Sequence, residues 1–245
     1  MFRWLVFLIV FPLYSVFLNV FGSLFYKKSP WFRRTYQAML RIWSLLILWP
    51  IRIKIEISNS DRKRLLSPNR SQMIVANHKS HLDSLILWAI VPKENFLCFA
   101  AKKELFKLPI CGKILTFNES IKIDRANPQG AYDNLSTGFD LSDIPKTLVI
   151  YAEGTRNTKT SILLPFKRGP FLVAKQANIP ILPVIIHGTQ YSMPSGKFLP
   201  KQAIVTVKVL DLINPEYFPN DITVFQNTVW KRMKTECELL QDAFQ

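Results

Sequence analysis

His78 and Asp83 are the two residues of this chain whose types and spacing most directly suggest chemistry. The chain has three histidines, and two of them, His78 and His81, lie in the heptapeptide that ends at Asp83. A carboxylate bonded to one imidazole nitrogen fixes the tautomer and leaves the other nitrogen as a general base. This is the logic of a serine-hydrolase triad with a substrate hydroxyl in place of the serine. The pattern therefore predicts activation of a hydroxyl group by His78.

The elements around this pair must bring it together. Two residues five positions apart on a continuous helix point about 140° away from each other around the axis. His78 and Asp83 can therefore meet only if a helix begins between them. Residues 72–76 are typical of a buried strand, and residues 80–90 of the helix that follows it. With Ser80 as N-cap, Asp83 would lie in the first helical turn and His78 in the preceding turn.

Two other interpretations of the heptapeptide stay open. In the first, Ser80 and Asp83 only cap a helix, and His78 is an ordinary loop residue. In the second, His78, His81 and Asp83 are metal ligands. No further cluster of ligand-type residues accompanies them in the sequence, so we expect no metal site.

Two arginines follow further predicted strands. Arg125 comes after the strand expected at residues 120–123, and Arg156 follows the strand expected at residues 147–152. Guanidinium groups bind phosphate in a bidentate manner, so two of them at neighbouring strand ends predict a site for a phosphate head group. The alternative is that each arginine is a surface residue paired with an adjacent acidic side chain.

The rest of the chain alternates short apolar runs with helical patterns. This predicts an α/β domain with a central, mostly parallel sheet flanked by helices. Further strands are expected at residues 96–100, 181–186 and 203–210, and helices at 129–139, 169–177 and 222–243.

The N-terminal part has the composition of a membrane segment. Residues 4–26 carry no charge and could cross about 30 Å of hydrocarbon. A signal peptide is the competing interpretation, but the run is long for one and no clear cleavage site follows. The apolar patch at residues 42–51 suits an interfacial helix or a re-entrant arm. We expect residues 1–56 to form a helical membrane arm and residues 57–245 a catalytic domain.

The charge distribution favours an anionic membrane as partner. The net charge is +15, and seven cations lie between the first apolar run and the first acidic residue, Glu56: Lys27, Lys28, Arg33, Arg34, Arg41, Arg52 and Lys54. Arg3 alone lies on the other side of that run. By the positive-inside rule, this bias predicts a protein of the inner or cytoplasmic membrane whose catalytic domain faces the cytoplasm. Nucleic acid is not expected, because the cations adjoin apolar runs instead of stacking aromatics. Three widely spaced cysteines suggest a reduced compartment.

Four blocks between residues 72 and 188 resemble the glycerolipid acyltransferase family, and most closely its 1-acylglycerol-3-phosphate acyltransferases. They are the NHxxxxD motif from Asn77 to Asp83, the block at 120–125, the EGTR block Glu153-Gly154-Thr155-Arg156, and the proline-containing strand at 179–184. The resemblance implies that His78 is the base and Asp83 its partner. It implies acceptor binding by Arg125, Glu153, Gly154, Thr155 and Arg156, with support from Asn77, Ser80, Lys122, Lys167 and Pro183.

This resemblance also implies an activity. The expected reaction moves a fatty acyl group from acyl-CoA or acyl-carrier protein to the sn-2 hydroxyl of 1-acylglycerol 3-phosphate, giving phosphatidic acid, with no metal or redox cofactor. Glu119 and Lys122 depart from the family, which commonly has glycine and an aromatic residue there. Another acceptor, such as a lyso-aminolipid, another lysophospholipid or glycerol 3-phosphate, therefore stays open. A non-enzymatic membrane scaffold is a further alternative.

Overall fold

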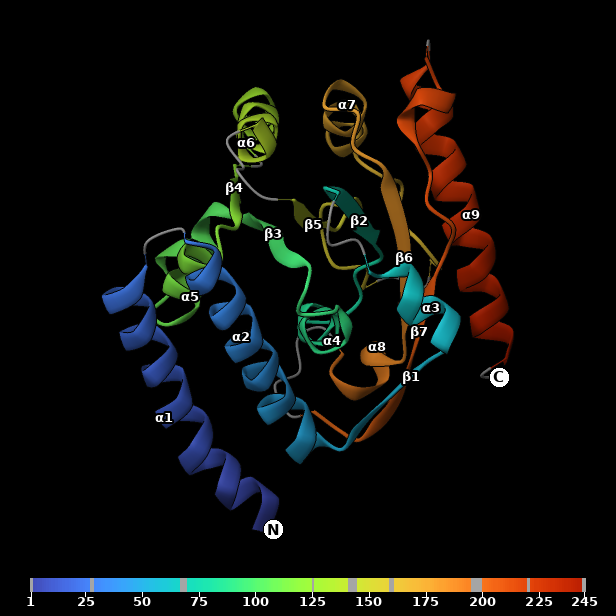
Figure 1. Ribbon diagram of the computed structural model, residues 1–245. Helices are drawn as coiled ribbons and strands as arrows, with labels where there is room; N and C mark the ends of the chain where they lie inside the picture. Colours follow the sequence, from blue (N-terminus) through green and yellow to red (C-terminus); the bar gives the residue numbers. More distant parts are fainter. Residues whose placement is uncertain are drawn as a thin grey trace.

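A seven-stranded sheet forms the centre of the computed structural model (Figure 1), which describes residues 2–26, 29–66, 70–124, 126–140, 145–158, 161–194, 200–219 and 221–243. The strand order is β1-β7-β6-β2-β5-β3-β4. All neighbours are parallel except β6 and β7, so the expected mostly parallel α/β fold is confirmed. The strands are β1 Ile53–Ile57, β2 Gln72–Ala76, β3 Phe96–Lys102, β4 Ile121–Ile123, β5 Lys146–Ile150, β6 Ile181–His187 and β7 Ala203–Val209.

Helices cover both faces of the sheet. They are α1 Phe2–Phe25, α2 Pro30–Ile51, α3 Asn59–Arg64, α4 Asp83–Ile90, α5 Cys111–Phe117, α6 Pro128–Asp140, α7 Gly169–Gln176, α8 Thr189–Ser192 and α9 Ile222–Ala243, with 3₁₀ helices η1 Lys103–Lys107 and η2 Pro215–Tyr217. Successive strand residues point to opposite faces. In β2, Ile74 therefore packs with α2 and α4, whereas Met73 and Val75 pack with α7 and α9. The sheet is buried on both sides, as parallel sheets usually are.

The helix α2 is longer than the expected patch at residues 42–51. Ser29 caps it by accepting a hydrogen bond from the Phe32 amide, and Pro30 occupies the first helical position, where its missing N–H costs nothing. Phe32, Tyr36 and Leu40 are fully or almost fully buried in the core that α2 shares with α4. This helix is thus part of the folded domain and does not lie alone at an interface.

Polar contacts also attach α2 to the sheet. The Gln37 side-chain amide donates to the carbonyl of Leu97 in β3 at 2.7 Å, and it also contacts Asn118. The predicted boundary between residues 56 and 57 falls inside β1, which pairs with β7 along its whole length. The division into a membrane arm and a catalytic domain stays a prediction, with its boundary inside a strand of the sheet.

The helix α1 lies beside α2 (Figure 1). From Leu8 to Phe25 it leaves many of its apolar side chains exposed. Its contacts with α2 include a hydrogen bond from the Tyr14 hydroxyl to the Met39 carbonyl and another from the Trp43 indole to the Ser15 hydroxyl. Among the described helices, only α1 has a segment, Phe7–Phe25, long and apolar enough to cross a membrane, and 22% of that window is buried.

Candidate active site

His78 and Asp83 meet at the carboxyl end of β2. His78 Nδ1 lies 2.8 Å from Asp83 Oδ2, and the two side chains are 18% and 1% exposed. His78 belongs to the turn after the strand, and Asp83 is the first residue of α4. This local geometry agrees with the expected one. A carboxylate at Nδ1 favours the tautomer with its proton there, so Nε2 is the nitrogen left for proton transfer.

Asp83 is held by more donors than the histidine alone. Its Oδ2 also accepts the backbone amides of Lys79 and Ser80 at 2.8 and 2.9 Å, and its Oδ1 accepts the Thr189 hydroxyl at 2.6 Å. Thr189 is fully buried and comes from the segment after β6. Hydrogen bonds to a carboxylate are strong and fix its orientation. The carboxylate of Asp83 is therefore held in one orientation by hydrogen bonds from the protein itself.

The expected N-cap role of Ser80 is wrong. The helix begins at Asp83, three residues later than predicted, and its N-cap residue is Leu82, which makes no side-chain capping bond. The Ser80 hydroxyl instead donates to the carbonyl of Met193 at 2.9 Å, while Leu82 N donates back to that hydroxyl at 3.3 Å. Ser80 thus ties the histidine loop to the segment after α8.

Glu153 lies beneath the histidine loop. Its Oε1 accepts the backbone amide of His78 at 2.7 Å, and its Oε2 accepts the amide of Leu164 at 2.9 Å. The residue is 2% exposed, and burial raises the pKa of its carboxyl from the ordinary 4.5 to about 7, against the lowering effect of the two backbone bonds. Both oxygens are thus occupied by the protein's own backbone. This placement differs from the expected role of Glu153 in acceptor binding.

Tyr151 packs against the histidine ring. The two ring centroids are 3.9 Å apart with an interplanar angle of 14°, and the Tyr151 hydroxyl lies 2.8 Å from the Ser84 hydroxyl. Such stacking fixes the plane of the imidazole, and an aromatic face favours a neighbouring cation. Sequence reasoning missed both Tyr151 and Thr189. Nothing in the local spacing marks either residue, because each meets the histidine–aspartate pair only through the fold.

Asn77 fastens β2 to its neighbour β6 at the level of the site. Its amide donates to the Ile186 carbonyl at 3.0 Å and accepts the Ile186 amide at 2.8 Å. Pro183 lies in the same strand, buried and paired with Val75, so it belongs to the wall behind the histidine loop. The ends of three adjacent strands, β5, β2 and β6, therefore build the site, as α/β folds commonly do.

The EGTR block forms the turn after β5. Gly154 has φ +72°, a conformation that favours glycine, and a β-carbon there would lie 3.2 Å from the Lys167 side chain. Thr155 and Lys167 are exposed, and the Arg156 guanidinium contacts His81 Nε2. Burial, followed by this arginine, lowers the pKa of His81. Arg156 therefore contacts the heptapeptide that carries His78.

The structure describes only part of the second family block, residues 120–125. Arg125 lies outside the described residues. Lys122 is exposed in β4, with its ammonium 5.2 Å from the centroid of the Phe106 ring. Glu119 has φ +51°, and its buried carboxylate pairs with Arg33 at 2.7 Å and with Lys146 at 3.3 Å. The acidic residue that departs from the family pattern thus has a structural partner in α2.

The expectation of no metal site concerns His78, His81 and Asp83. In the structure, His78 and Asp83 bind each other while His81 contacts Arg156. Among the residues that the structure describes, no group of three or more His, Cys, Asp or Glu side chains is arranged to hold a metal ion.

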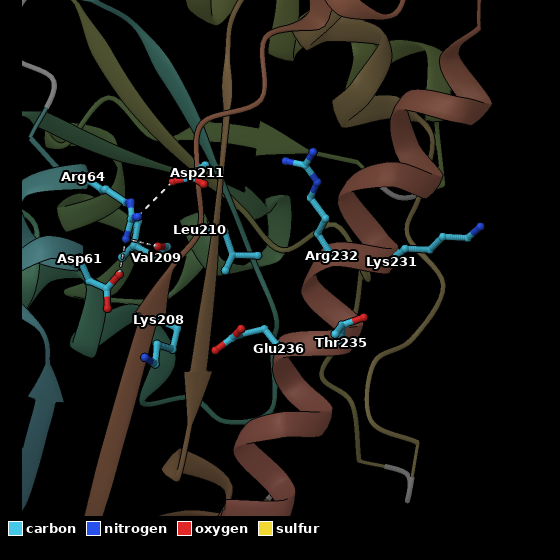
Figure 2. Close-up of a pocket in the computed structure, with 10 residues that line it drawn as sticks. All are labelled: Asp61, Arg64, Lys208, Val209, Leu210, Asp211, Lys231, Arg232, Thr235 and Glu236. Carbon is cyan, nitrogen blue, oxygen red and sulfur yellow. Dashed lines mark hydrogen bonds and ion pairs between the residues drawn. The ribbon is translucent and has the colours of Figure 1, made fainter.

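A separate pocket of about 670 Å³ lies between α3, the end of β7 and α9 (Figure 2). Arg64 bridges Asp61 and Asp211 at its rim, both at 3.1 Å. None of the expected site residues lines this pocket. We therefore place the candidate active site at His78.

Comparison with known proteins identifies the family of this chain. The profile of the acyltransferase family matches residues 54–187, which is more than half of the chain and includes the histidine loop and the EGTR block. The chain therefore belongs to the acyltransferase family.

Individual proteins similar to this chain are acyltransferases with closely related names. Over 172 residues the chain is 31% identical to a 1-acyl-sn-glycerol-3-phosphate acyltransferase of Limnanthes alba, covering 70% of this chain and 58% of that relative. A protein of the same name from Helicobacter pylori is 36% identical over 116 residues, or 47% of this chain and 48% of its own length. The crystal structure of the 1-acyl-sn-glycerophosphate acyltransferase PlsC from Thermotoga maritima superposes with a TM-score of 0.71 at 22% identity and covers 98% of both chains. That structure shows the same fold.

Proposed function

We propose that this protein transfers a fatty acyl group from acyl-CoA or acyl-carrier protein to the sn-2 hydroxyl of 1-acylglycerol 3-phosphate, giving phosphatidic acid. The observation that carries the proposal is the 2.8 Å contact between His78 Nδ1 and an aspartate held by three further donors. The family match supports the reaction class, and the names of the relatives support this acceptor.

The reaction begins with removal of the acceptor hydroxyl proton by His78 Nε2. The oxygen attacks the thioester carbonyl, the carbon–sulfur bond breaks, and His78 returns the proton to the leaving thiolate. The products are an ester and a free thiol, so no redox or metal chemistry is needed. Asp83 stabilises the imidazolium that forms between the two proton transfers. The Tyr151 ring stacks on the imidazole of His78, fixes its orientation and offers an aromatic face to that cation.

The acceptor phosphate needs cations near the histidine. Arg156, in the turn after β5, contacts His81 in the loop after β2, and Arg125 is the second candidate from the sequence. Replacing Arg156 by alanine should chiefly raise the KM for a phosphate-bearing acceptor. Gly154 and Thr155 shape the turn that presents this arginine. Glu153 acts differently, because its carboxylate positions the backbone of His78.

Membrane association fits a lipid acceptor. The exposed apolar surface of α1 and the basic residues near the turn into α2 would hold the domain at an anionic bilayer, with the domain on the cytoplasmic side. The second candidate, an acyltransferase for another acceptor, is favoured by Lys122, an exposed residue that departs from the family pattern.

A panel of acceptors and donors tests the proposal. The purified full chain is given 1-acylglycerol 3-phosphate, glycerol 3-phosphate or a lyso-aminolipid, each with acyl-CoA or acyl-carrier protein, and release of free thiol is followed. The proposal predicts the fastest release with 1-acylglycerol 3-phosphate. Faster release with another acceptor would favour the second candidate, and no acceptor-dependent release would favour a scaffold.

A further inference from the structure

The segment between β3 and α5 exposes apolar side chains in a rigid conformation. Leu105, Leu108 and Ile110 are 39%, 48% and 41% exposed, although all three lie within six consecutive residues. Single exposed apolar residues are ordinary, but clustered ones mark an interaction surface. We call residues 105–110 the apolar loop.

Backbone geometry holds this loop in place. Ile110 has φ +63° and ψ −65°, and the Cys111 amide donates to the Pro109 carbonyl at 2.7 Å across it. This is a γ-turn of the rare, strained kind, and a β-branched residue is especially disfavoured in it. Strain of this kind persists only where the surroundings impose it, and it is common at functional sites.

Close packing supplies that constraint. A β-carbon at Gly112 would lie 2.1 Å from the carbonyl oxygen of Phe106, so the backbone of η1 rests directly on the start of α5. Phe106 itself is half-buried, with the ammonium of Lys122 5.2 Å from the centroid of its ring. The loop is therefore preorganised, and its exposed apolar side chains do not fold back into the core.

Helix α5, which begins directly after the apolar loop, packs against the end of α1. The rings of Tyr26 and Phe117 are 5.4 Å apart, which joins the end of α1 to α5, and Figure 1 shows α5 beside this end of the hairpin. Leu24, Phe25 and Trp31 are 69%, 46% and 58% exposed there. The hairpin and the apolar loop thus expose apolar side chains on two elements that α5 connects, and the hairpin includes a tryptophan of the type that favours the membrane interface.

Basic side chains surround the apolar loop. Lys102, Lys103, Lys107 and Lys113 are exposed, and two of them form ion pairs at the surface, Lys102 with Glu104 and Lys103 with Asp124. Four cations against these two carboxylates leave the border of the loop positively charged. An apolar tip with a cationic border fits the interface of an anionic bilayer, where the leucines enter the acyl boundary and the lysines meet phosphate.

We infer that the apolar loop is a second membrane-docking element, which inserts into an anionic lipid surface beside α1. This inference rests on the proposed action on lipids. Docking at two points would fix the orientation of the sheet, because one helix alone leaves the domain free to rotate about it. It would hold β3 and β4 close to the head groups, and β4 lies within the second family block, residues 120–125.

Lipid-borne quenching tests the inference directly. Cys98 and Cys237 are buried, so a chain with Cys111→Ala can carry one new cysteine for a fluorophore. The probe is placed by Leu108→Cys, by Phe17→Cys on α1, or by Leu239→Cys on α9, where the native side chains are 48%, 53% and 58% exposed. Vesicles of phosphatidylcholine and phosphatidylglycerol with brominated acyl chains then act as quencher.

Quenching at positions 108 and 17 but not at 239 is the expected result. Quenching at position 17 alone would overturn the docking role of the loop while leaving the α1 anchor intact. Quenching at none of the three would overturn both the loop and the membrane association in the proposed function.

Activity gives a second readout. Leu105→Gln with Leu108→Gln should slow acylation of an acceptor embedded in vesicles by about tenfold, because apolar contact with the bilayer is lost. Activity on the same acceptor in detergent should stay unchanged. The matched control is Leu212→Gln with Leu239→Gln, whose native side chains are 40% and 58% exposed. Equal losses in both pairs on vesicles would contradict the inference.

Discussion

Arg33 of α2 and Glu119 before β4 form a buried, bidentate ion pair, with contacts of 2.7 and 3.3 Å between residues 86 positions apart. Lys146 at the start of β5 joins the same carboxylate at 3.3 Å. The pair connects the N-terminal hairpin to the strand that carries the second block. It also explains an acidic residue where the family commonly has glycine, since Glu119 keeps the positive φ of +51° and adds a partner for α2.

Removing Arg33 should destabilise the fold. Arg33→Met leaves Glu119 buried with one cation instead of two, and breaking a buried pair costs about 3–5 kcal/mol. The free energy of unfolding in denaturant should fall by that order. The control is Lys54→Met, which breaks the exposed pair with Glu56 and should cost at most about 1 kcal/mol. Similar losses in both variants would contradict a structural role for the buried pair.

Deleting helices should separate anchoring from folding. A chain that begins at residue 52 lacks the buried side chains of α2 and should fail to show cooperative unfolding. A chain that begins at residue 29 keeps α2 and should unfold cooperatively, but it should bind vesicles at least about tenfold more weakly. Circular dichroism and vesicle sedimentation check the two outcomes. Cooperative unfolding of the shorter chain would show that α2 is dispensable to the domain.

The raised pKa of the Glu153 carboxyl predicts that the stability of the fold depends on pH. The unfolded carboxyl ionises near 4.5 and the folded one near 7, so the folded protein binds the proton more tightly between these values. The stability that this group contributes is therefore fully present below pH 4.5 and is lost as the pH rises through 7, by about 3 kcal/mol at most. Glu153→Gln should remove this loss, so the difference in unfolding free energy between wild type and variant should change with pH. A constant difference from pH 4.5 to 7 would argue against the raised pKa.

Thr189 should act on catalysis through Asp83. Thr189→Val removes a 2.6 Å hydrogen bond to the carboxylate, and a bond to a charged group contributes roughly 1.5–3 kcal/mol. We expect kcat to fall roughly tenfold or more, with little change in the KM for the acceptor. Thr189→Ser retains the hydroxyl and should restore most of the rate. A change in KM alone, or no rescue by serine, would exclude this positioning role.

The sequence predicted those features whose cause is local. The strand Gln72–Ala76 and the helix Ile222–Ala243 have the expected limits because their apolar periodicity is uninterrupted. The start of α4 was misplaced because the Ser80 hydroxyl bonds a carbonyl 113 positions away instead of the helix amides. The packing of the first half of α2 into the domain was not predicted, because Arg33 and Gln37 look like surface residues until their distant partners are known.

The candidate site also combines features with a local cause and features that depend on distant contacts. The spacing of His78 and Asp83, read together with the strand-end arginines, predicted the contact that the structure shows. Tyr151, Thr189 and the inward-facing carboxylate of Glu153 depend on how β5, β2 and β6 lie side by side, and no single segment carries that information. The roles of the arginines stay predictions.

The central claim is that His78 is the general base of an acyl transfer. Its most direct test is thiol release from acyl-CoA by His78→Ala with 1-acylglycerol 3-phosphate as acceptor. Loss of a well-placed base should reduce the rate by about 10²–10⁴, while the unfolding transition and vesicle binding stay at wild-type values. Acceptor-dependent thiol release near the wild-type rate would contradict the claim.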